Sequence, residues 1–343
     1  MSAPRIAVLG AGANGASIGA DLVRAGHDVT LIEQWPEHVA AMRADGVRIV
    51  MPDGEWTVPV DACNLCDVAT FTDPFDVVLI LMKAYDTRWA AHLIAPHVKD
   101  DGLVVGVQNG MTADVVAEVV GPRRAVGSVI ECSSELFEPG VVQRHTPSAR
   151  SWFAVGALGP ESAGREAEVA ALLDHAGTVA VVDDIRSAKW MKLVSNCTTL
   201  VTTAMLGLPM RAALDVPGMR ALMLRAGQEA LDAGVALGHE VLPIFGLAAA
   251  DVARPEAVVE TLLDQLYDNF VLPHTTTTIL HDWRKGRHSE VDDLNGHVAA
   301  LAPGGAPVNA AVTEIAHRIE RGDLAPSPAN AALLAELAGA AMA

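Results

Sequence analysis

Cysteine and positive charge are scarce in this sequence of 343 residues. The four cysteines indicate no disulfide framework, which suits a reducing compartment. Lys and Arg number 24 against 42 Asp and Glu, so the formal net charge is −18. Nucleic acids and anionic membrane surfaces require basic patches on their protein partners, and this charge therefore argues against both.

Long apolar runs are also missing, and no stretch reaches the length of a membrane span. The N-terminus has no basic start followed by an apolar segment, so we expect a cytoplasmic protein. Cys63 and Cys66 have C-x-x-C spacing, but no second pair or histidine cluster follows at zinc spacing. We therefore predict no metal site. With 51% hydrophobic residues, the chain can bury a core and form two domains.

The most informative stretch, residues 5–20, reads RIAVLGAGANGASIGA. Its apolar start predicts a buried parallel strand at 6–9, and a G-x-G-x-x-G pattern follows. In that pattern the glycines permit a tight turn, the approach of a pyrophosphate and close packing of the next helix, expected at about 14–25. The prediction is a dinucleotide site, with an ordinary glycine-rich turn as the alternative. The candidate cofactor-binding residues are Gly10, Gly12, Ala13, Asn14 and Gly15.

A second strand, at 27–33, ends in Glu33, eighteen residues after Gly15. This is close to the spacing of a carboxylate that binds the adenosine ribose of a dinucleotide. A 2′-phosphate beside Glu33 would meet like charge, so we favour NAD(H) over NADP(H). Arg43 or Arg48 would reverse that preference if either folded back to the site.

Strand and helix patterns alternate up to about residue 185, which predicts an N-terminal, Rossmann-type doubly wound sheet over 1–185. Residues 140–143 and 152–155 are interpreted together as an antiparallel extension of it. Further strands are expected at 75–82, 103–107, 125–132 and 179–182, a hairpin at 47–60, and helices at 37–44, 87–98, 113–119 and 161–176.

From residue 186 onward the strand patterns fade and amphipathic helical segments replace them. This predicts an all-α C-terminal domain over 186–343. Its expected helices are residues 188–206, 217–236, 255–270, 306–321 and 329–341.

Two candidate site residues follow buried strands of the first domain, where ligands of open α/β sheets bind. Lys83 follows the apolar run 75–82, and Asn109 ends a strand before Gly110. The chain uses Arg nineteen times and Lys only five times, so a strand-end lysine draws attention. Snorkelling of Lys83 and plain turn chemistry at Asn109 are the competing interpretations.

The first helix of the second domain carries Lys189, Lys192 and Asn196, and Lys192 and Asn196 share one face. Thr203, eleven residues after Lys192, lies at nearly the same angle around the helix axis. Such polar groups on an apolar helix are costly to bury unless they line a polar cleft. An ammonium group can serve as a general acid for a ketone, whereas a guanidinium cannot release its proton.

A third cluster, residues 274–296, contains Thr277 and Thr278 and then Glu290 and Asp292. Taken alone, it is typical of a solvated, charged helix junction. The two carboxylates are candidate metal ligands, but no further ligand recurs at a convincing spacing.

Together these residues resemble the ketopantoate reductase (2-dehydropantoate 2-reductase) family over nearly the whole chain. The resemblance implies a Rossmann domain and a helical domain with the active site between them. It also implies that Lys192 protonates the carbonyl oxygen during hydride transfer and that Glu290 orients Lys192. The resemblance rests on the glycine pattern, Lys83, Gln108-Asn109-Gly110, Trp190-x-Lys192-Leu-x-x-Asn196, Thr277-Thr278, Glu290-Val-Asp292, Asn295-Gly296 and Pro307-x-Asn309.

The same resemblance assigns Lys83 and Asn109 to the cofactor and the organisation of the site. It assigns Asn109, Asn196, Thr277 and Thr278 to the substrate. The sequence departs from the family at Leu200, where a second asparagine is usual, and the hydroxyl pair is usually serine. An apolar residue in place of an amide predicts a substrate less polar than, or shaped differently from, ketopantoate.

The functional hypothesis is an NAD(P)-dependent oxidoreductase that interconverts a small, ketopantoate-like 2-oxo acid and its hydroxy acid. A second hypothesis is a catabolic NAD-dependent alcohol or hydroxy-acid dehydrogenase of the same family with a different substrate. A non-catalytic NAD(H)-binding redox sensor and an opine-type or β-hydroxyacid dehydrogenase are the third and fourth hypotheses. The expected partner is a small molecule, with a homodimer left open.

Overall fold

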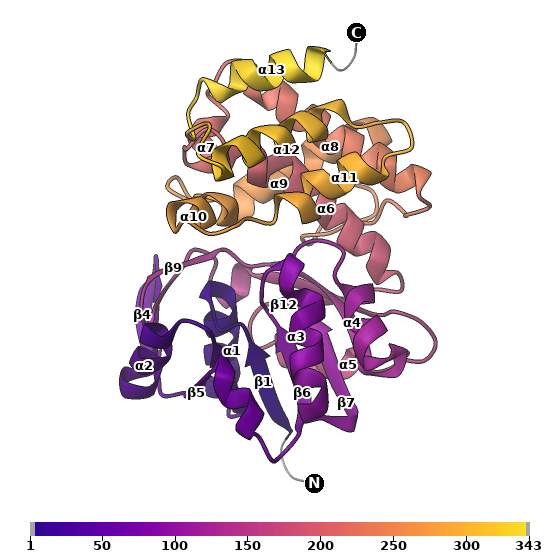
Figure 1. Ribbon diagram of the computed structural model, residues 1–343. Coiled ribbons are helices and arrows are strands. Elements are labelled where there is room, and N and C mark those ends of the chain that lie inside the picture. The colour runs from indigo at the N-terminus through magenta and orange to yellow at the C-terminus, as the bar shows by residue number, and fades with distance from the viewer. Residues whose placement is uncertain (1–3, 341–343) are drawn as a thin grey trace. The chain divides into compact units, whose positions relative to one another are not determined.

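The computed structural model describes residues 4–340, and the chain divides into two compact units. The first holds the chain up to Gln108 and Thr112–Arg186. The second holds Asn109–Met111 and the chain from Ser187 onward. Figure 1 colours the first unit from indigo to magenta and most of the second from pink to yellow. Asn109–Met111 thus cluster with the second unit although they directly follow a strand of the first.

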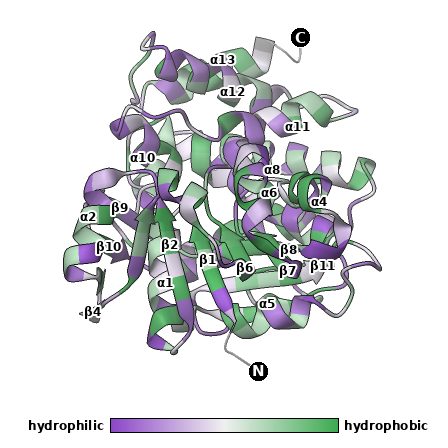
Figure 2. Cartoon of the chain, turned by 60° about the horizontal axis from the view of Figure 1, so that its bottom comes forward, coloured by the Kyte–Doolittle hydropathy of each residue, from purple (hydrophilic) through white to green (hydrophobic). Residues whose placement is uncertain are grey.

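The first unit is built on an eight-stranded sheet in the order β12-β11-β8-β7-β6-β1-β2-β5. All neighbouring strands are parallel except β8 and β11, so the predicted doubly wound sheet is confirmed. The central strands are almost wholly apolar, as Figure 2 shows, because helices cover both of their faces. The strands are β1 Arg5–Leu9, β2 Asp28–Glu33, β5 Asp61–Asn64, β6 Phe75–Ile80, β7 Val98–Gly106, β8 Ala125–Glu131, β11 Trp152–Ala157 and β12 Thr178–Val181.

The helices of this unit follow the predicted alternation. Two of them are shorter than predicted. The helix expected at 87–98 ends at Ile94, and β7 already begins at Val98. The helix expected at 161–176 is confined to α5. Gly159, Pro160 and Gly164, whose φ is +89°, keep the preceding residues in turns. The helices are α1 Ala13–Arg24, α2 Pro36–Asp45, α3 Thr87–Ile94, α4 Ala113–Val120 and α5 Glu166–Leu173.

A smaller sheet with the order β4-β3-β10-β9 corrects one prediction. Of the two segments expected to extend the main sheet, only β11 does so, antiparallel to β8. The other, β10, pairs in parallel with β3 and buries Val142 beside Ile49. An alternating apolar pattern cannot specify which sheet edge a strand joins. The strands are β3 Val47–Met51, β4 Gly54–Val58, β9 Ser134–Glu138 and β10 Val141–Arg144.

The second unit is helical, as predicted, and five of its helices match the expected segments to within a few residues. These are α6 Ile185–Ala204, α8 Met219–Ala236, α9 Val258–Asn269, α12 Pro307–Glu320 and α13 Asn330–Ala340. Residue 341, the predicted end of the last helix, lies outside the described residues. Three short helices were not predicted, because segments of four to seven residues are too short to show a helical period. These are α7 Met210–Ala213, α10 Thr278–Arg284 and α11 Asn295–Leu301.

Helix α6 is buried along almost its entire length, so its polar groups need partners inside the protein. Four threonines solve this locally, because each hydroxyl donates to the carbonyl four residues earlier. For Thr203 the acceptor is Thr199 at 2.7 Å. Thr203 therefore satisfies itself within the helix rather than depending on a polar cleft. The other three are Thr198, Thr199 and Thr202. Over residues 4–340, no helix is both long enough and apolar enough to cross a bilayer.

Candidate active site

The glycine-rich turn joins β1 to α1, and two of its glycines have no room for a side chain. Gly10 has a φ of +97°, and a Cβ built on it would lie 2.8 Å from Met82. A Cβ on Gly15 would lie 2.1 Å from the carbonyl oxygen of Gly10. A Cβ on Gly12, by contrast, would meet no heavy atom within 4 Å. Gly10 and Gly15 therefore shape the turn, whereas Gly12 leaves open surface beside it.

The first turn of α1 begins at this open surface. Gly12 is the N-cap, no side chain caps the helix, and the first turn contains no acidic residue. The first N–H groups of a helix have no intrahelical acceptors and together carry about half a positive charge. This geometry fits a pyrophosphate, which the backbone of Gly12, Ala13 and Asn14 would hold.

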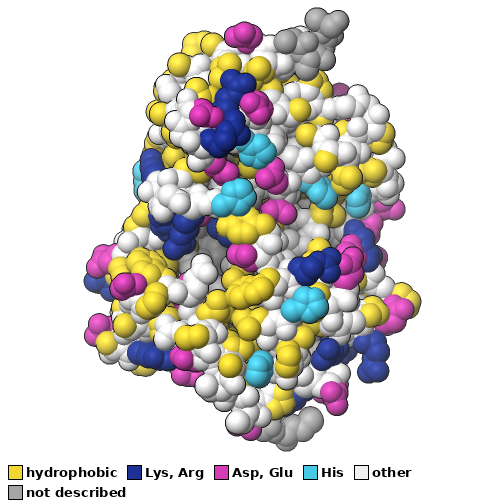
Figure 3. Space-filling view, viewed as in Figure 1, with side chains coloured by type: hydrophobic (Ala, Val, Ile, Leu, Met, Phe, Trp, Pro, Cys, Tyr) yellow, Lys and Arg dark blue, Asp and Glu magenta, His cyan; other side chains and the backbone are white. Residues whose placement is uncertain are grey.

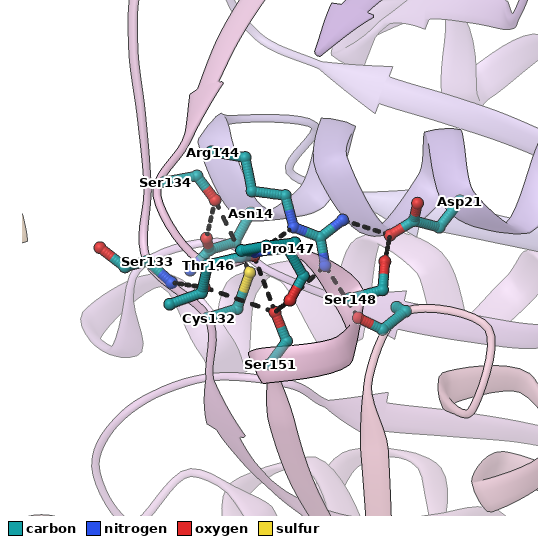
Figure 4. Close-up of polar contacts among 11 residues, drawn as sticks. Asn14, Asp21, Cys132, Ser133, Ser134, Arg144, Thr146, Pro147, Ser148 and Ser151 are labelled. Carbon is teal, nitrogen blue, oxygen red and sulfur yellow. Dashed lines mark hydrogen bonds and ion pairs between the residues drawn. The ribbon is translucent and has the colours of Figure 1, made fainter. Parts of the chain in front are cut away.

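The smaller sheet braces α1 at two points, as Figure 4 shows. Ser134 of β9 donates a hydrogen bond to Asn14 Oδ1 at 2.7 Å, within the first turn of the helix. Arg144 of β10 is fully buried and forms an ion pair with Asp21, farther along the same helix. Burial raises the pKa of the Asp21 carboxyl, although the Arg144 charge acts to lower it. These pairs lie 120 and 123 residues apart in sequence, so no local pattern indicated them.

Glu33 ends β2 and is only 7% exposed. Its Oε1 accepts hydrogen bonds from the backbone N–H groups of Gln34 at 2.9 Å and Trp35 at 3.1 Å. These bonds hold the carboxylate at the strand end where such folds bind the ribose hydroxyls of a dinucleotide. Arg43, one of the two arginines considered for a 2′-phosphate, instead donates to Asp67 at 3.1 Å.

Lys83 lies three residues after the end of β6 and is half-buried. Its carbonyl oxygen accepts a hydrogen bond from Asp86 at 3.0 Å, which starts the next turn. The Gln108 side chain donates to the Met82 carbonyl at 2.7 Å and to Thr87 at 3.1 Å. Gln108 therefore fixes the turn that presents Lys83, a role that the sequence did not reveal.

The second unit brings together the predicted polar groups of α6 and Asn109. Asn196 is 1% exposed, and its Nδ2 donates to Asn109 Oδ1 at 3.1 Å. Lys192, one turn earlier on the same helix, is 8% exposed. Lys189 is also buried. Both asparagines were predicted as site residues, but their direct contact could not be, since 87 residues separate them.

Phe245 is a residue near Lys192 that the sequence did not single out. The Lys192 ammonium lies 5.0 Å from the centre of its ring, which is within the range of a cation–π interaction. Phe245 has a φ of +60°, the one positive φ outside glycine among residues 4–340. Its carbonyl oxygen accepts a hydrogen bond from Gln265 at 2.8 Å, which helps to hold this strained conformation. The only sequence signal was the following Gly246, a common turn residue.

Glu290 is 4% exposed and precedes the short helix Val291–Asp293. Asp293 donates its backbone N–H to the Glu290 carbonyl at 3.1 Å. Burial, followed by the nearby charges of Glu290 and Asp292, raises the pKa of Asp293 to about 6. Asp293 was not predicted as a site residue, and only its place beside Glu290 draws attention to it.

The Thr277 hydroxyl forms hydrogen bonds with the backbone of two other residues. Its hydroxyl donates to the carbonyl of Leu200 at 3.0 Å and accepts a hydrogen bond from the Leu280 N–H at 3.5 Å. It thus caps α10 and ties that helix to α6. The hydroxyl proton is already used, so Thr277 could only accept a hydrogen bond from a substrate. Thr278 begins α10 and is half-buried.

Asn295 and Asn309, both part of the sequence resemblance, connect helices within the second unit. Asn295 donates to Asn309 Oδ1 at 2.8 Å and to the Cys197 carbonyl of α6 at 3.2 Å. Asn309 donates to the Ala226 carbonyl of α8 at 2.9 Å and to Glu229 at 2.9 Å. This network binds α8, α11 and α12 to α6, so these asparagines stabilise the helix that carries Lys192.

The cysteine pair and the acidic residues form no metal centre within the described part of the chain. Cys63 and Cys66 are both free, and burial, with Asp61 and Asp67 nearby, raises the pKa of Cys63 to about 12. Such a thiol is not nucleophilic near neutral pH. Across residues 4–340, no three side chains of His, Cys, Asp or Glu meet as a metal site would require.

Known protein families match both units of the chain. The family described as Ketopantoate reductase PanE/ApbA matches residues 6–157, and Ketopantoate reductase PanE/ApbA C terminal matches residues 184–320. A 2-dehydropantoate 2-reductase of Mesorhizobium japonicum is 28% identical over 324 residues, covering 87% of this chain and 91% of its own. One from Halobacterium salinarum is 28% identical over 300 residues, covering 87% and 92%.

Solved structures agree on the fold. A PanE/ApbA family ketopantoate reductase from Ralstonia eutropha JMP134 has a TM-score of 0.77 at 26% identity, over 93% of this chain and 99% of that chain. D-mandelate dehydrogenase, solved with NADH and anilino(oxo)acetate, has a TM-score of 0.80 at 20% identity with the same coverage, and shows the fold alone. Because the two family matches cover most of the chain, this protein belongs to the ketopantoate reductase family of NAD(P)-dependent oxidoreductases acting on CH–OH groups.

Proposed function

We propose that this protein interconverts a small 2-oxo acid and its 2-hydroxy acid with Lys192 as the general acid and base. The observation that carries the proposal is the buried α6 face, where Lys192 lies one turn from Asn196 and Asn196 contacts Asn109. Burying an ammonium group is costly, so a lysine kept there in a family of oxidoreductases supports a chemical role.

In the proposed mechanism, Lys192 gives a proton to the carbonyl oxygen as the 2-oxo carbon is reduced, and takes it back in the oxidation. Hydride transfer is the chemistry that a nicotinamide cofactor supplies when bound. Glu290, buried in the same unit, is proposed to orient Lys192. Asn109, Asn196, Thr277 and Thr278 are proposed to position the ligands, Thr277 only as an acceptor.

For the cofactor, we propose NADH in preference to NADPH. A buried carboxylate at Glu33 would accept hydrogen bonds from ribose hydroxyls and repel a 2′-phosphate. The engagement of Arg43 with Asp67 supports the same preference, because that guanidinium already has a carboxylate partner. The proposed roles of the glycine turn and of Lys83 hold for either cofactor. A cytoplasmic location and a homodimer stay predictions from the sequence.

The substrate is proposed to be less polar than ketopantoate near Leu200. This half-buried leucine lies one turn after Asn196 on α6, and a hydrogen-bonding site loses much discrimination when an amide is replaced by an apolar group. D-mandelate dehydrogenase, which shares the fold, was solved with anilino(oxo)acetate. A 2-oxo acid with an apolar substituent therefore becomes the leading candidate, and ketopantoate itself the second.

The experiment that tests this function is a spectrophotometric screen. NADH and NADPH are followed with ketopantoate and with aliphatic and aromatic 2-oxo acids, and NAD⁺ and NADP⁺ with the matching alcohols. We expect steady oxidation of NADH with at least one apolar 2-oxo acid. Binding of NADH without turnover on any compound would instead favour a redox sensor.

A variant sharpens the substrate assignment. Leu200→Asn introduces the amide that the family usually has, so ketopantoate turnover should rise relative to the apolar substrate by about tenfold. Leu200→Ala, which removes the side chain without adding an amide, is the matched control and should not favour ketopantoate. If the ratio of ketopantoate turnover to turnover of the apolar substrate is equal in both variants, the assignment of Leu200 to substrate recognition is contradicted.

A further inference from the structure

A pocket of about 570 Å³ lies within the second unit, formed by α10, the turn after it, the end of α12 and the segment that follows. A volume of this order is typical of sites for small organic ligands. Part of its wall is apolar, contributed by Leu280, Ile319 and Pro326. The pocket uses none of the residues assigned above to the cofactor, the substrate or proton transfer.

Glu320 is the one acidic group in the lining, and both of its carboxylate oxygens already have hydrogen-bond partners. Its Oε1 accepts hydrogen bonds from the indole N–H of Trp283 at 3.2 Å and the hydroxyl of Ser289 at 2.5 Å. Its Oε2 lies 3.0 Å from His288 Nδ1. Burial acts to raise the pKa of Glu320, but the bonds from Ser289 and Trp283 bring it below its ordinary value. This carboxylate is therefore ionised and has its partners within the protein.

Two basic groups in the lining differ from Glu320. Arg284 and Arg287 are exposed, and neither guanidinium makes a hydrogen bond or ion pair with any residue in the range 4–340. On the face drawn in Figure 3, several basic side chains lie beside acidic ones. Within the second unit, Arg220 lies 2.7 Å from the carboxylate of Glu260. In a chain with a net charge of −18, two arginines without carboxylate partners beside an apolar wall are suited to an anion from outside the chain.

We propose that this pocket binds a small organic anion with an apolar body. A carboxylate, phosphate or sulfonate head would pair with Arg284 and Arg287, whose planar guanidinium groups suit such oxygens. The apolar body would lie against Leu280, Ile319 and the ring of Trp283. The Trp283 N–H is committed to Glu320, so the ring contributes an apolar surface rather than a donor.

The test uses anilinonaphthalene sulfonate, an aromatic anion whose fluorescence rises in apolar surroundings, and the uncharged N-phenylnaphthylamine as its matched probe. Excess NAD⁺ and NADP⁺ are present, so that the cofactor site is filled. We expect saturable binding of the anionic probe at one site per chain. The double variant Arg284→Ala/Arg287→Ala should raise its Kd about tenfold, because charge-assisted contacts are lost. The uncharged probe should change by less than threefold.

Arg150→Ala/Arg254→Ala is the control, because it makes the same change in net charge. Both arginines are exposed, and neither guanidinium has a partner within the part of the chain that the structure describes. It should leave the Kd of the anionic probe unchanged. Arg284→Lys/Arg287→Lys, which keeps the charge, should recover part of the affinity. The proposal is overturned if the anionic probe shows no saturable site, or if both alanine pairs change its Kd equally.

Discussion

The two proposed binding sites, the glycine-rich turn of the first unit and helix α6 of the second, are built in opposite ways. At the turn, Gly12 leaves open surface and backbone N–H groups without caps, so the site consists of what the side chains do not occupy. On α6, Lys192 and Asn196 are polar side chains enclosed by protein. The first site depends on steric fit of the backbone, and the second on partners for buried polar groups.

Both sites rely on contacts from distant parts of the chain within their own unit. Ser134 and Arg144 hold α1 in place, and the network of Asn295, Asn309 and Glu229 holds α6. The difference teaches where each site is vulnerable. A single added methyl group damages the turn, whereas α6 is damaged by the loss of a charged or amide group.

The largest expected effect belongs to α6. Lys192→Ala should lower turnover by about a hundredfold or more, because general acid–base catalysis contributes about that much. The affinity for NADH, measured by fluorescence titration, should be nearly unchanged. Lys192→Arg is the matched variant and should be almost as inactive, since a guanidinium does not release its proton. Near-normal turnover in either variant would refute the assignment.

The glycine turn offers a pair of variants that separates fold from binding. Gly15→Ala places a Cβ 2.1 Å from a backbone oxygen and should lower the free energy of unfolding by about 2–3 kcal/mol. Gly12→Ala meets no atom within 4 Å, so thermal stability should stay close to that of the parent. Its NADH affinity should nonetheless fall about tenfold, because the methyl group would occupy the path of the pyrophosphate. A stable Gly12→Ala protein with unchanged affinity would show that the cofactor binds elsewhere.

The cofactor preference gives a smaller effect. Glu33→Ala should weaken NADH use about tenfold, the worth of a hydrogen bond to a charged group, and should improve NADPH use. Glu33→Gln separates two contributions, because it keeps an oxygen for the Gln34 and Trp35 N–H groups but removes the charge. Both variants should raise the ratio of NADPH to NADH activity in steady-state assays. An unchanged ratio would contradict the NADH preference.

The smallest effect concerns Asp293. Its folded-state pKa of about 6 lies above the ordinary value of 3.8, so the folded state binds the proton more tightly than the unfolded state does. The resulting stabilisation is complete below about pH 4 and is lost as the pH rises through 6. Asp293→Asn should therefore gain about 1 kcal/mol over the parent above pH 6, after allowance for solvent screening, and little at pH 4. Urea unfolding from pH 4 to 8 measures this, and a difference independent of pH would contradict it.

Local sequence was sufficient to predict some features because their causes are local. The glycine spacing before α1, the acid at the end of β2 and the four-residue spacing of Lys192 and Asn196 depend on neighbouring residues alone. The features that the sequence did not predict depend on residues far apart in the chain. The placement of β10 beside β3, the Phe245 ring over Lys192 and the engagement of Thr277 with Leu200 join segments that no periodicity connects.

The sequence by itself determined the alternation of strands and helices in the first unit, the glycine-rich turn before α1 and the type of residue available on α6. These follow from sterics and from periodicities of two and 3.6 residues. Only the tertiary structure decided that Asn109 meets Asn196, that Thr277 caps a helix, and that Arg284 and Arg287 line one pocket with no carboxylate partner among the described residues. The physical reason is that burial and hydrogen-bond partners belong to the packed chain, and one-dimensional patterns do not fix them.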